Sequence, residues 1–201
     1  MTDGAQSDEL SLEALRSGDR AEFARLVDQF SGPIYRLGLK ITDHTQDAED
    51  VLQETFLKAY RALSGFEGRS SLATWLYRIA VNEALMLVRR RQPDSVSLEA
   101  DVEGEDGQQE PMQIVDFCCL PESELLTAEA RQFLDNAIQN LPDSLKVVFL
   151  LRDIEGLSIR DTMEALDLSE TAVKTRLLRA RLNLREQLSS YYGERLKEEQ
   201  A

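Results

Sequence analysis

The sequence predicts an all-α protein in which two small helical domains are joined by a flexible acidic linker, the C-terminal domain being a helix-turn-helix. Three observations support this prediction. Residues 19–92 and 126–192 are rich in Leu, Ala, Arg and Glu, which favour helices, and their β-branched residues rarely cluster. Their apolar residues recur at helical spacing. Between them, residues 93–125 carry ten acidic side chains, no basic ones and three of the five prolines.

Overall composition excludes several classes of protein. The chain has 201 residues, of which 42% are hydrophobic, enough to form real cores. It has no run of 18 uncharged apolar residues, so we expect no membrane insertion. Residues 1–4 show neither the basic patch nor the apolar stretch of a secretory signal. We therefore expect a cytoplasmic protein.

The sequence contains few groups suited to catalysis. Cys118 and Cys119 are adjacent and are expected to be free thiols, while His44 is the only histidine. No glycine-rich phosphate loop, nucleophile elbow or distinct pair of carboxylates occurs. The sequence thus predicts no catalytic residue, no metal and no cofactor, and an enzyme is the weaker class.

Acidic charge is concentrated in one stretch. The formal net charge is −14, and residues 93–125 account for −10 of it. Because such a composition buries too little apolar surface to offset its ordering entropy, it is typical of a linker. The two domains, 19–92 and 126–192, are nearly neutral. Residues 1–18 form an N-terminal tail with the start of the first helix, and residues 193–201 form a C-terminal tail.

The segment 45–63 predicts a helix with two different faces. At 100° per residue its core face is Ala48, Leu52, Phe56, Ala59 and Leu63. The opposite face carries carboxylates around a leucine: Asp47, Asp50, Gln53, Glu54, Leu57 and Arg61. This face is either a solvated surface or a partner site, in which charges orient an apolar anchor.

A second helix is predicted from a cap at Ser71 to about residue 91. Its core stripe is Leu72, Leu76, Ile79, Ala80 and Leu87, and a second face holds Trp75, Arg78, Asn82, Met86 and Arg89. Phe66 and Tyr77 flank that face. Aromatic, amide and cationic groups together suit single-stranded nucleic acid, which needs stacking surfaces and phosphate neutralisation. Alternatively, Trp75 and Tyr77 pack in the core.

Residues 157–188 have the pattern of a helix-turn-helix. Ser158 and Asp161 resemble a capping box, Asp167 lies at a sharp turn, and Ser169 can cap the second helix. That helix has an apolar seam of Val173, Leu177, Ala180 and Leu184. Around it lie basic residues, and the layout suits a recognition helix whose first turns, with Thr171, Lys174 and Thr175, reach base edges while later arginines contact phosphates. A solvated charged helix is the alternative.

These motifs, in this order, resemble the bacterial sigma-70 family of RNA polymerase sigma factors, in particular its extracytoplasmic-function (ECF) group. Residues 47–56 (DAEDVLQETF) are similar to the core-polymerase-binding motif, and residues 66–82, which include ATWLYRIAVN at 73–82, are similar to the promoter-melting segment. Residues 82–90 cover the part that reads the minus-10 element, and residues 141–188 resemble the domain that reads the minus-35 element. Met86, Asp167 and the pair at 162–163 depart from the common pattern.

The resemblance implies a function in three steps: binding of core RNA polymerase through its beta-prime clamp and beta flap, direction to promoter DNA, and melting of that DNA. It also implies an anti-sigma partner. The implied polymerase-binding residues are Asp47, Asp50, Gln53, Glu54 and Leu57. The implied minus-10 and melting residues are Phe66, Arg69, Ser71, Thr74, Trp75, Tyr77, Arg78, Asn82, Met86, Arg89 and Arg90. The implied minus-35 residues are Thr171, Lys174, Thr175, Arg176, Arg179 and Arg181.

A rival interpretation is a stand-alone transcriptional regulator that binds a palindrome as a dimer through its helix-turn-helix. The face from Trp75 to Arg89 discriminates the two, because a protein that binds only duplex DNA does not need it.

Overall fold

The computed structural model describes residues 10–91 and 128–198, and these residues form helices and connecting turns without strands. In the first part α1 (Leu12–Arg16), α2 (Arg20–Thr42), α3 (Thr45–Ala62) and α4 (Leu72–Arg91) follow one another, with a 3₁₀ turn, η1 (Leu63–Gly65), after α3. The second part holds α5 (Ala128–Gln139), α6 (Asp143–Phe149), a π-helical turn η2 (Leu150–Ile154), α7 (Ile159–Leu166) and α8 (Glu170–Glu198). The predicted linker 93–125, including Cys118 and Cys119, lies outside the described residues.

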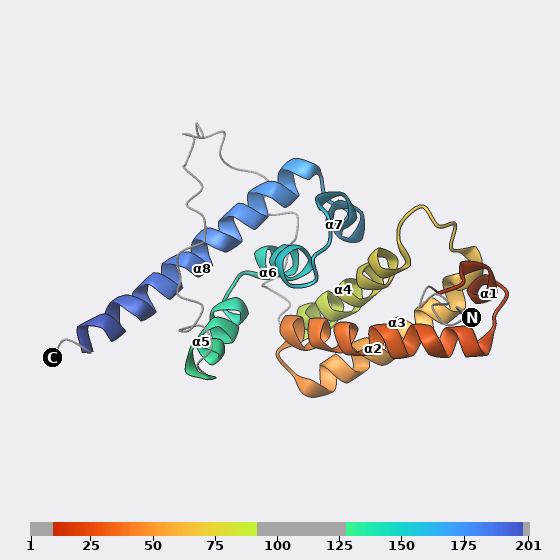
Figure 1. The fold of residues 1–201 in the computed structure, drawn as a ribbon, viewed down its shortest axis with the longest axis horizontal. Coiled ribbons are helices and arrows are strands. Elements are labelled where there is room, and N and C mark those ends of the chain that lie inside the picture. The colour runs from red at the N-terminus through yellow and green to blue at the C-terminus, as the bar shows by residue number, and fades with distance from the viewer. Residues whose placement is uncertain (1–9, 92–127, 199–201) are drawn as a thin grey trace, which may run out of the picture.

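The first domain is a bundle in which α2, α3 and α4 pack side by side (Figure 1). The predicted core stripe of α3 faces inward, with Ala48, Phe56 and Ala59 all buried. Gly38 on α2 permits the close approach of α3, because a Cβ at this position would lie 3.3 Å from the Val51 side chain. The all-α prediction is confirmed for the described residues.

The second domain contains the predicted helix-turn-helix, α7 and α8. The hydroxyl of Ser158 accepts a hydrogen bond from the Asp161 N–H at 3.0 Å and so caps α7. Asp167 ends α7 in the left-handed region at a φ of 54°, a conformation that an aspartate tolerates at modest cost. The hydroxyl of Ser169 accepts from the Ala172 N–H and begins α8. The helix continues to Glu198, past residue 193, where the sequence predicted the start of a C-terminal tail.

The two domains pack against each other, which the sequence patterns did not indicate. Helix α4 lies against α7, and α6 and α7 lie between α4 and the long α8 (Figure 1). Polar contacts between described residues join the domains, among them the bond that the Tyr77 hydroxyl donates to Glu155 and the pair in which Lys40 Nζ lies 2.8 Å from Asp135 Oδ1. Buried residues of both domains form one continuous core cluster.

A second apolar stripe on α4 explains this packing. Tyr77, Val81 and Leu85 are spaced four residues apart and therefore share one side of the helix. All three are buried, and Tyr77 contacts Glu155 of the second domain. Because α4 is apolar on this side as well as toward α2 and α3, it is covered from both directions.

Candidate polymerase and nucleic-acid interfaces

The outer face of α3 combines carboxylates with an exposed leucine. Asp50 and Gln53 are exposed, and 43% of Leu57 is accessible to solvent. Glu54 is half-buried and lies 3.8 Å from Lys58, whose Nζ also contacts Glu83 at 2.6 Å. Four of the five residues predicted to bind the polymerase thus lie on one accessible face.

Asp47, the fifth predicted residue, does not lie on this exposed face. Only 7% of it is accessible, and its carboxylate lies 2.8 Å from Nη2 of Arg91. The reason is that the last turn of α4 ends beside the first turn of α3, so the Arg91 guanidinium covers the carboxylate. In this structure Asp47 joins α3 to α4 and is buried, unlike the other residues of the predicted face, and its contact with the polymerase stays a prediction.

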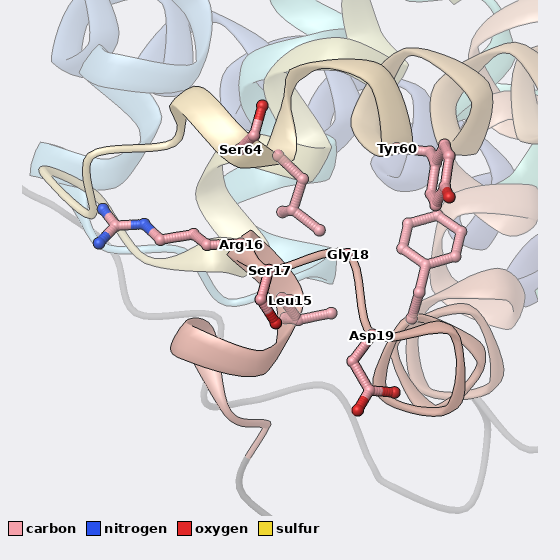
Figure 2. A pocket seen from close by; sticks show the side chains of 9 residues that line it. Leu15, Arg16, Ser17, Gly18, Asp19, Tyr60 and Ser64 are labelled. Atoms are coloured by element: carbon pink, nitrogen blue, oxygen red, sulfur yellow. The ribbon is translucent and has the colours of Figure 1, made fainter.

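Tyr60 extends the α3 face beyond the predicted residues. It is spaced three residues from Leu57, and 48% of it is accessible. Its ring packs edge-on against Phe23, with ring centroids 5.0 Å apart. Next to it lies a pocket of about 250 Å³ between α1, the start of α2 and the end of α3, which Leu15, Asp19, Leu63 and Ser64 also line (Figure 2). The spacing from Leu57 was the sequence signal for Tyr60.

The loop before α4 is built around two buried side chains. Phe66 is buried, and its ring packs against Trp75 with centroids 4.9 Å apart and planes tilted by 39°. Thr74 is also buried, and its N–H donates to the Ser71 hydroxyl at 3.0 Å, which caps α4. Phe66 and Thr74 were predicted to meet DNA directly. Both are buried in this structure and support the loop and the start of α4, and their contact with DNA stays a prediction.

Beyond this loop, α4 carries the predicted polar and cationic face. Trp75 is half-buried, and the side chains that continue this face are exposed: Arg78, Asn82, Met86, Arg89 and Arg90. Arg69 in the loop is exposed and pairs with Glu67 at 2.7 Å. The helical spacing therefore brings one partly exposed aromatic ring, an amide and three cations to one side of α4.

Tyr77 occupies a different place from the one predicted. Only 6% of it is accessible, and its hydroxyl donates to Glu155 Oε2 at 2.5 Å. Burial, together with the hydrogen bond to the Glu155 carboxylate, raises the pKa of Tyr77 above its ordinary value. The spacing that separates Tyr77 from Trp75 places it on the stripe that faces the second domain. In this arrangement Tyr77 does not reach the surface where nucleic acid would bind.

The first turns of α8 present the predicted base-reading residues. Thr171, Lys174 and Arg179 are exposed, and Thr175 is half-buried. Lys174 Nζ lies 2.6 Å from Glu170 Oε1, one turn before it. This hydrogen bond holds the pKa of Glu170 below its usual range. Lys174 is thus exposed on the helix surface, where it forms an ion pair with Glu170.

Two other arginines of α8 do not present free cations to solvent. Arg176 is only 4% accessible because it lies three residues from Val173, on the buried side of the helix. Arg181 donates two hydrogen bonds to Asp153, at 2.8 and 2.7 Å, and these bonds raise its pKa. Arg181 joins α8 to η2. Arg176 is buried in this structure, and its contact with DNA stays a prediction.

Within residues 10–91 and 128–198, the structure gathers no group of three or more His, Cys, Asp or Glu side chains that could hold a metal ion. In the same part of the chain, none of the helices is both long enough and apolar enough to cross a bilayer.

The geometry defines a class of protein: a helical domain with an acidic face and an aromatic, cationic face, followed by a helix-turn-helix. Two family models match these parts, sigma-70 region 2 over residues 26–93 and sigma-70 region 4 over residues 131–184. The chain belongs to the sigma-70 family of RNA polymerase sigma factors, in its ECF group. It is therefore a DNA-binding factor of transcription initiation.

Relatives match along most of the chain. It is 35% identical over 177 residues to the ECF RNA polymerase sigma factor SigW of Bacillus subtilis, covering 88% of this chain and 94% of SigW. It is 37% identical over 178 residues to the ECF RNA polymerase sigma-E factor of Haemophilus influenzae, covering 87% and 92%.

One solved structure, of CnrH in complex with the cytosolic domain of CnrY, has a similar fold. It superposes with a TM-score of 0.63 and 25% identity, over 89% of this chain and 95% of that one.

Proposed function

We propose that the two domains of this sigma factor divide promoter recognition between them. Residues 19–92 bind core RNA polymerase and the minus-10 element, and residues 126–192 bind the minus-35 element. The chain acts without catalysis of its own, in the cytoplasm, where it meets polymerase and DNA. The observation that carries this proposal is the coexistence on one chain of an exposed acidic face with Leu57 and an exposed aromatic, cationic face on α4.

Polymerase binding is assigned to the outer face of α3. Asp50 and Gln53 set the orientation by meeting basic and polar groups of the beta-prime clamp, and Leu57 supplies the apolar anchor. Glu54 is half-buried and close to Lys58, so it contributes less free charge. Asp47 acts indirectly in this scheme, because its pair with Arg91 fixes the start of α3 against the end of α4.

Capture of the minus-10 strand is assigned to the exposed face of α4. Trp75 offers a stacking surface, Asn82 offers hydrogen bonds, and Arg78 offers a cation close to both. Arg89 and Arg90 neutralise phosphates further along the helix. Unstacking a base step costs a few kcal/mol, and stacking on an aromatic ring returns about 1–3 kcal/mol per base. Melting is therefore close to balanced, and contacts with the polymerase decide its direction.

The minus-35 element is assigned to the first turns of α8. Thr171, Lys174 and Thr175 reach base edges in the major groove, and Arg179 contacts phosphates. Arg176 and Arg181 hold α8 against the rest of the domain, because one is buried and the other is bound to Asp153.

Two further protein contacts are proposed. The second domain binds the beta flap of the polymerase, and an anti-sigma partner covers the polymerase and DNA faces. Family membership supports both, and the neighbouring CnrH structure was solved with the cytosolic domain of CnrY bound to it.

The experiment that tests the proposal is run-off transcription with purified core polymerase and the full chain. Specific initiation from a promoter with defined minus-35 and minus-10 elements, abolished when either element is scrambled, is the expected result. Binding of the chain to a palindromic duplex without core polymerase, and without initiation when core is added, would support the dimeric regulator instead.

A further inference from the structure

The short helix α1 is bound to the loop that precedes α4. Arg16, the last residue of α1, donates Nε and Nη2 to the carbonyl oxygen of Phe66, and the Nε bond is 2.6 Å long. These residues are 50 positions apart in the sequence. Figure 2 shows the Arg16 side chain reaching from α1 toward the loop after η1, while Leu15 points into the neighbouring pocket. A guanidinium that donates two bonds to one carbonyl fixes both its position and its direction.

Helix α1 meets the same loop at a second point. Gly68 has a φ of +74°, in the left-handed region, and a Cβ built there would lie 3.4 Å from Leu12 Cδ2. Leu15, on the same helix, is fully buried in the core of the first domain. The loop is therefore held by α1 at Phe66 and covered by it at Gly68.

The hydrogen bonds from Arg16 to the Phe66 carbonyl also affect Trp75. The residue whose carbonyl Arg16 binds is the one whose ring packs against the indole, 4.9 Å away. Rotation of the Phe66 backbone would move this ring and withdraw support from one side of Trp75. The orientation of the indole thus depends on a contact made by α1.

Helix α1 is itself anchored to α2. The Ser11 N–H donates to Glu22 Oε1 at 2.5 Å, and the other carboxylate oxygen of Glu22 pairs with Arg25 at 2.8 Å. A continuous series of bonds therefore leads from α2 through α1 to the loop.

We propose that Arg16 is a positioning residue for promoter melting: it holds the loop 66–71 so that Phe66 presents Trp75 to the minus-10 bases. Arg16 acts through its bonds to the Phe66 carbonyl and not by contact with DNA. The inference rests on the proposed role of Trp75 in minus-10 capture.

The main test is an Arg16→Ala variant of the full chain, assayed with core polymerase. Open-complex formation on a duplex promoter is expected to fall about tenfold, which corresponds to the loss of a charge-assisted hydrogen bond. On a promoter whose minus-10 region is already mismatched, the defect is expected to shrink to less than about threefold, because part of the unstacking cost is removed. Binding to core polymerase and to a duplex minus-35 element is expected to stay unchanged. Arg20→Ala, an exposed arginine four residues on, is the matched control.

A spectroscopic test separates positioning from general stability. Trp75 is the only tryptophan of the chain, so the fluorescence of the free protein reports its surroundings. Arg16→Ala is expected to shift its emission to longer wavelength and to raise quenching by acrylamide, whereas Arg20→Ala leaves both unchanged. Gly68→Ala strains the loop without changing charge, because the φ of +74° at this position disfavours a residue with a Cβ. It is expected to shift the Trp75 emission and to reduce open-complex formation on the duplex promoter in the same direction as Arg16→Ala.

The possible contrary results distinguish failure of the positioning role of Arg16 from failure of the proposed function of α4. Unchanged Trp75 emission in both Arg16→Ala and Gly68→Ala would overturn the positioning role. Full recovery of melting by Arg16→Lys would also overturn it, because a single ammonium keeps a phosphate contact but cannot reproduce the guanidinium fork. If Trp75→Ala leaves melting intact, the proposed function of α4 fails. If Trp75→Ala abolishes melting but Arg16→Ala does not, only the positioning role fails.

Discussion

The hydroxyl of Tyr77 donates a 2.5 Å hydrogen bond to Glu155, so an aromatic residue next to the nucleic-acid face of α4 joins the two domains. Trp75 and Tyr77 are two residues apart, yet they lie on different sides of the helix. One side carries Trp75, Arg78 and Asn82 at the surface, and the other is covered by the second domain. Helix α4 thus has two roles: one side packs against the second domain, and another side stays exposed at the surface.

Loss of the bond between Tyr77 and Glu155 should destabilise the packing of the two domains. Tyr77→Phe and Glu155→Gln are each expected to lower the free energy of unfolding by about 1–3 kcal/mol, because a buried hydrogen bond to a charged group is lost or weakened. The double variant is expected to lose less than the two single losses combined. Urea denaturation of all four proteins measures this coupling, and strictly additive losses would contradict it.

Alkaline pH should weaken the fold through the same tyrosine. The pKa of Tyr77 is raised by burial and by the Glu155 bond, so the unfolded chain releases this proton near pH 10 while the folded chain retains it. The stabilisation is fully present below about pH 10 and is lost as pH rises further. Measured between pH 8 and 11.5, unfolding free energy should fall less steeply in Tyr77→Phe than in the wild type. Equal slopes would show that Tyr77 does not contribute.

Local signals predicted the helix-turn-helix well, because its boundaries depend on neighbouring residues. Ser158 caps α7 through Asp161, three residues on, and Asp167 supplies the left-handed turn. The seam from Val173 to Leu184 is buried as its spacing predicts. Periodicity also gave the core face of α3, since that face contacts helices of its own domain.

Contacts between distant segments were not predictable in the same way. Tyr77, Val81 and Leu85 repeat every four residues, but this stripe lies close to the core stripe of α4, and nothing local says which surface covers it. From the sequence, Asp47 is expected to be an exposed carboxylate. In the structure Arg91, 44 residues later in the chain, lies beside it and covers it. A charged residue is usually exposed, but it can be buried when an oppositely charged residue from a distant part of the sequence pairs with it.

Acid should loosen α1. The bond from the Ser11 N–H and the pair with Arg25 hold the pKa of Glu22 below its ordinary value of 4.5. A lowered pKa means that this stabilisation is present above about pH 4.5 and is lost as pH falls through the folded-state pKa. Hydrogen exchange of the Ser11 amide, followed from pH 6 down to about pH 2, is expected to lose protection beyond the intrinsic change of rate once the folded-state pKa of Glu22 is passed. Glu22→Gln should lack that pH dependence, and protection retained over the whole range would contradict the assignment.

The α3 face should control affinity for the polymerase. Asp50→Asn removes an orienting charge and Leu57→Ala removes the exposed anchor, so each is expected to weaken binding of core polymerase, the leucine by about 1–3 kcal/mol. Both side chains are exposed, and the melting temperature should change little. Fluorescence anisotropy of a labelled chain titrated with core measures the affinity. Asp28→Asn, an exposed carboxylate on α2, is the control for charge, and an equal effect there would argue for a nonspecific charge effect.

Lys174 should read promoter sequence more than it stabilises the protein. It is exposed near the start of α8, and its pair with Glu170 one turn earlier is a solvent-exposed ion pair, which contributes little to the fold. If its ammonium contacts a base edge, Lys174→Ala is expected to weaken binding of the minus-35 duplex by about 1–3 kcal/mol, with the loss concentrated at one or two base pairs. Arg185→Ala, which removes an exposed charge further along α8, should leave sequence preference unchanged. Binding to a set of minus-35 duplexes, each with one base pair changed, separates these outcomes. An equal loss on every duplex would assign Lys174 to the phosphates, because a phosphate contact carries no sequence information.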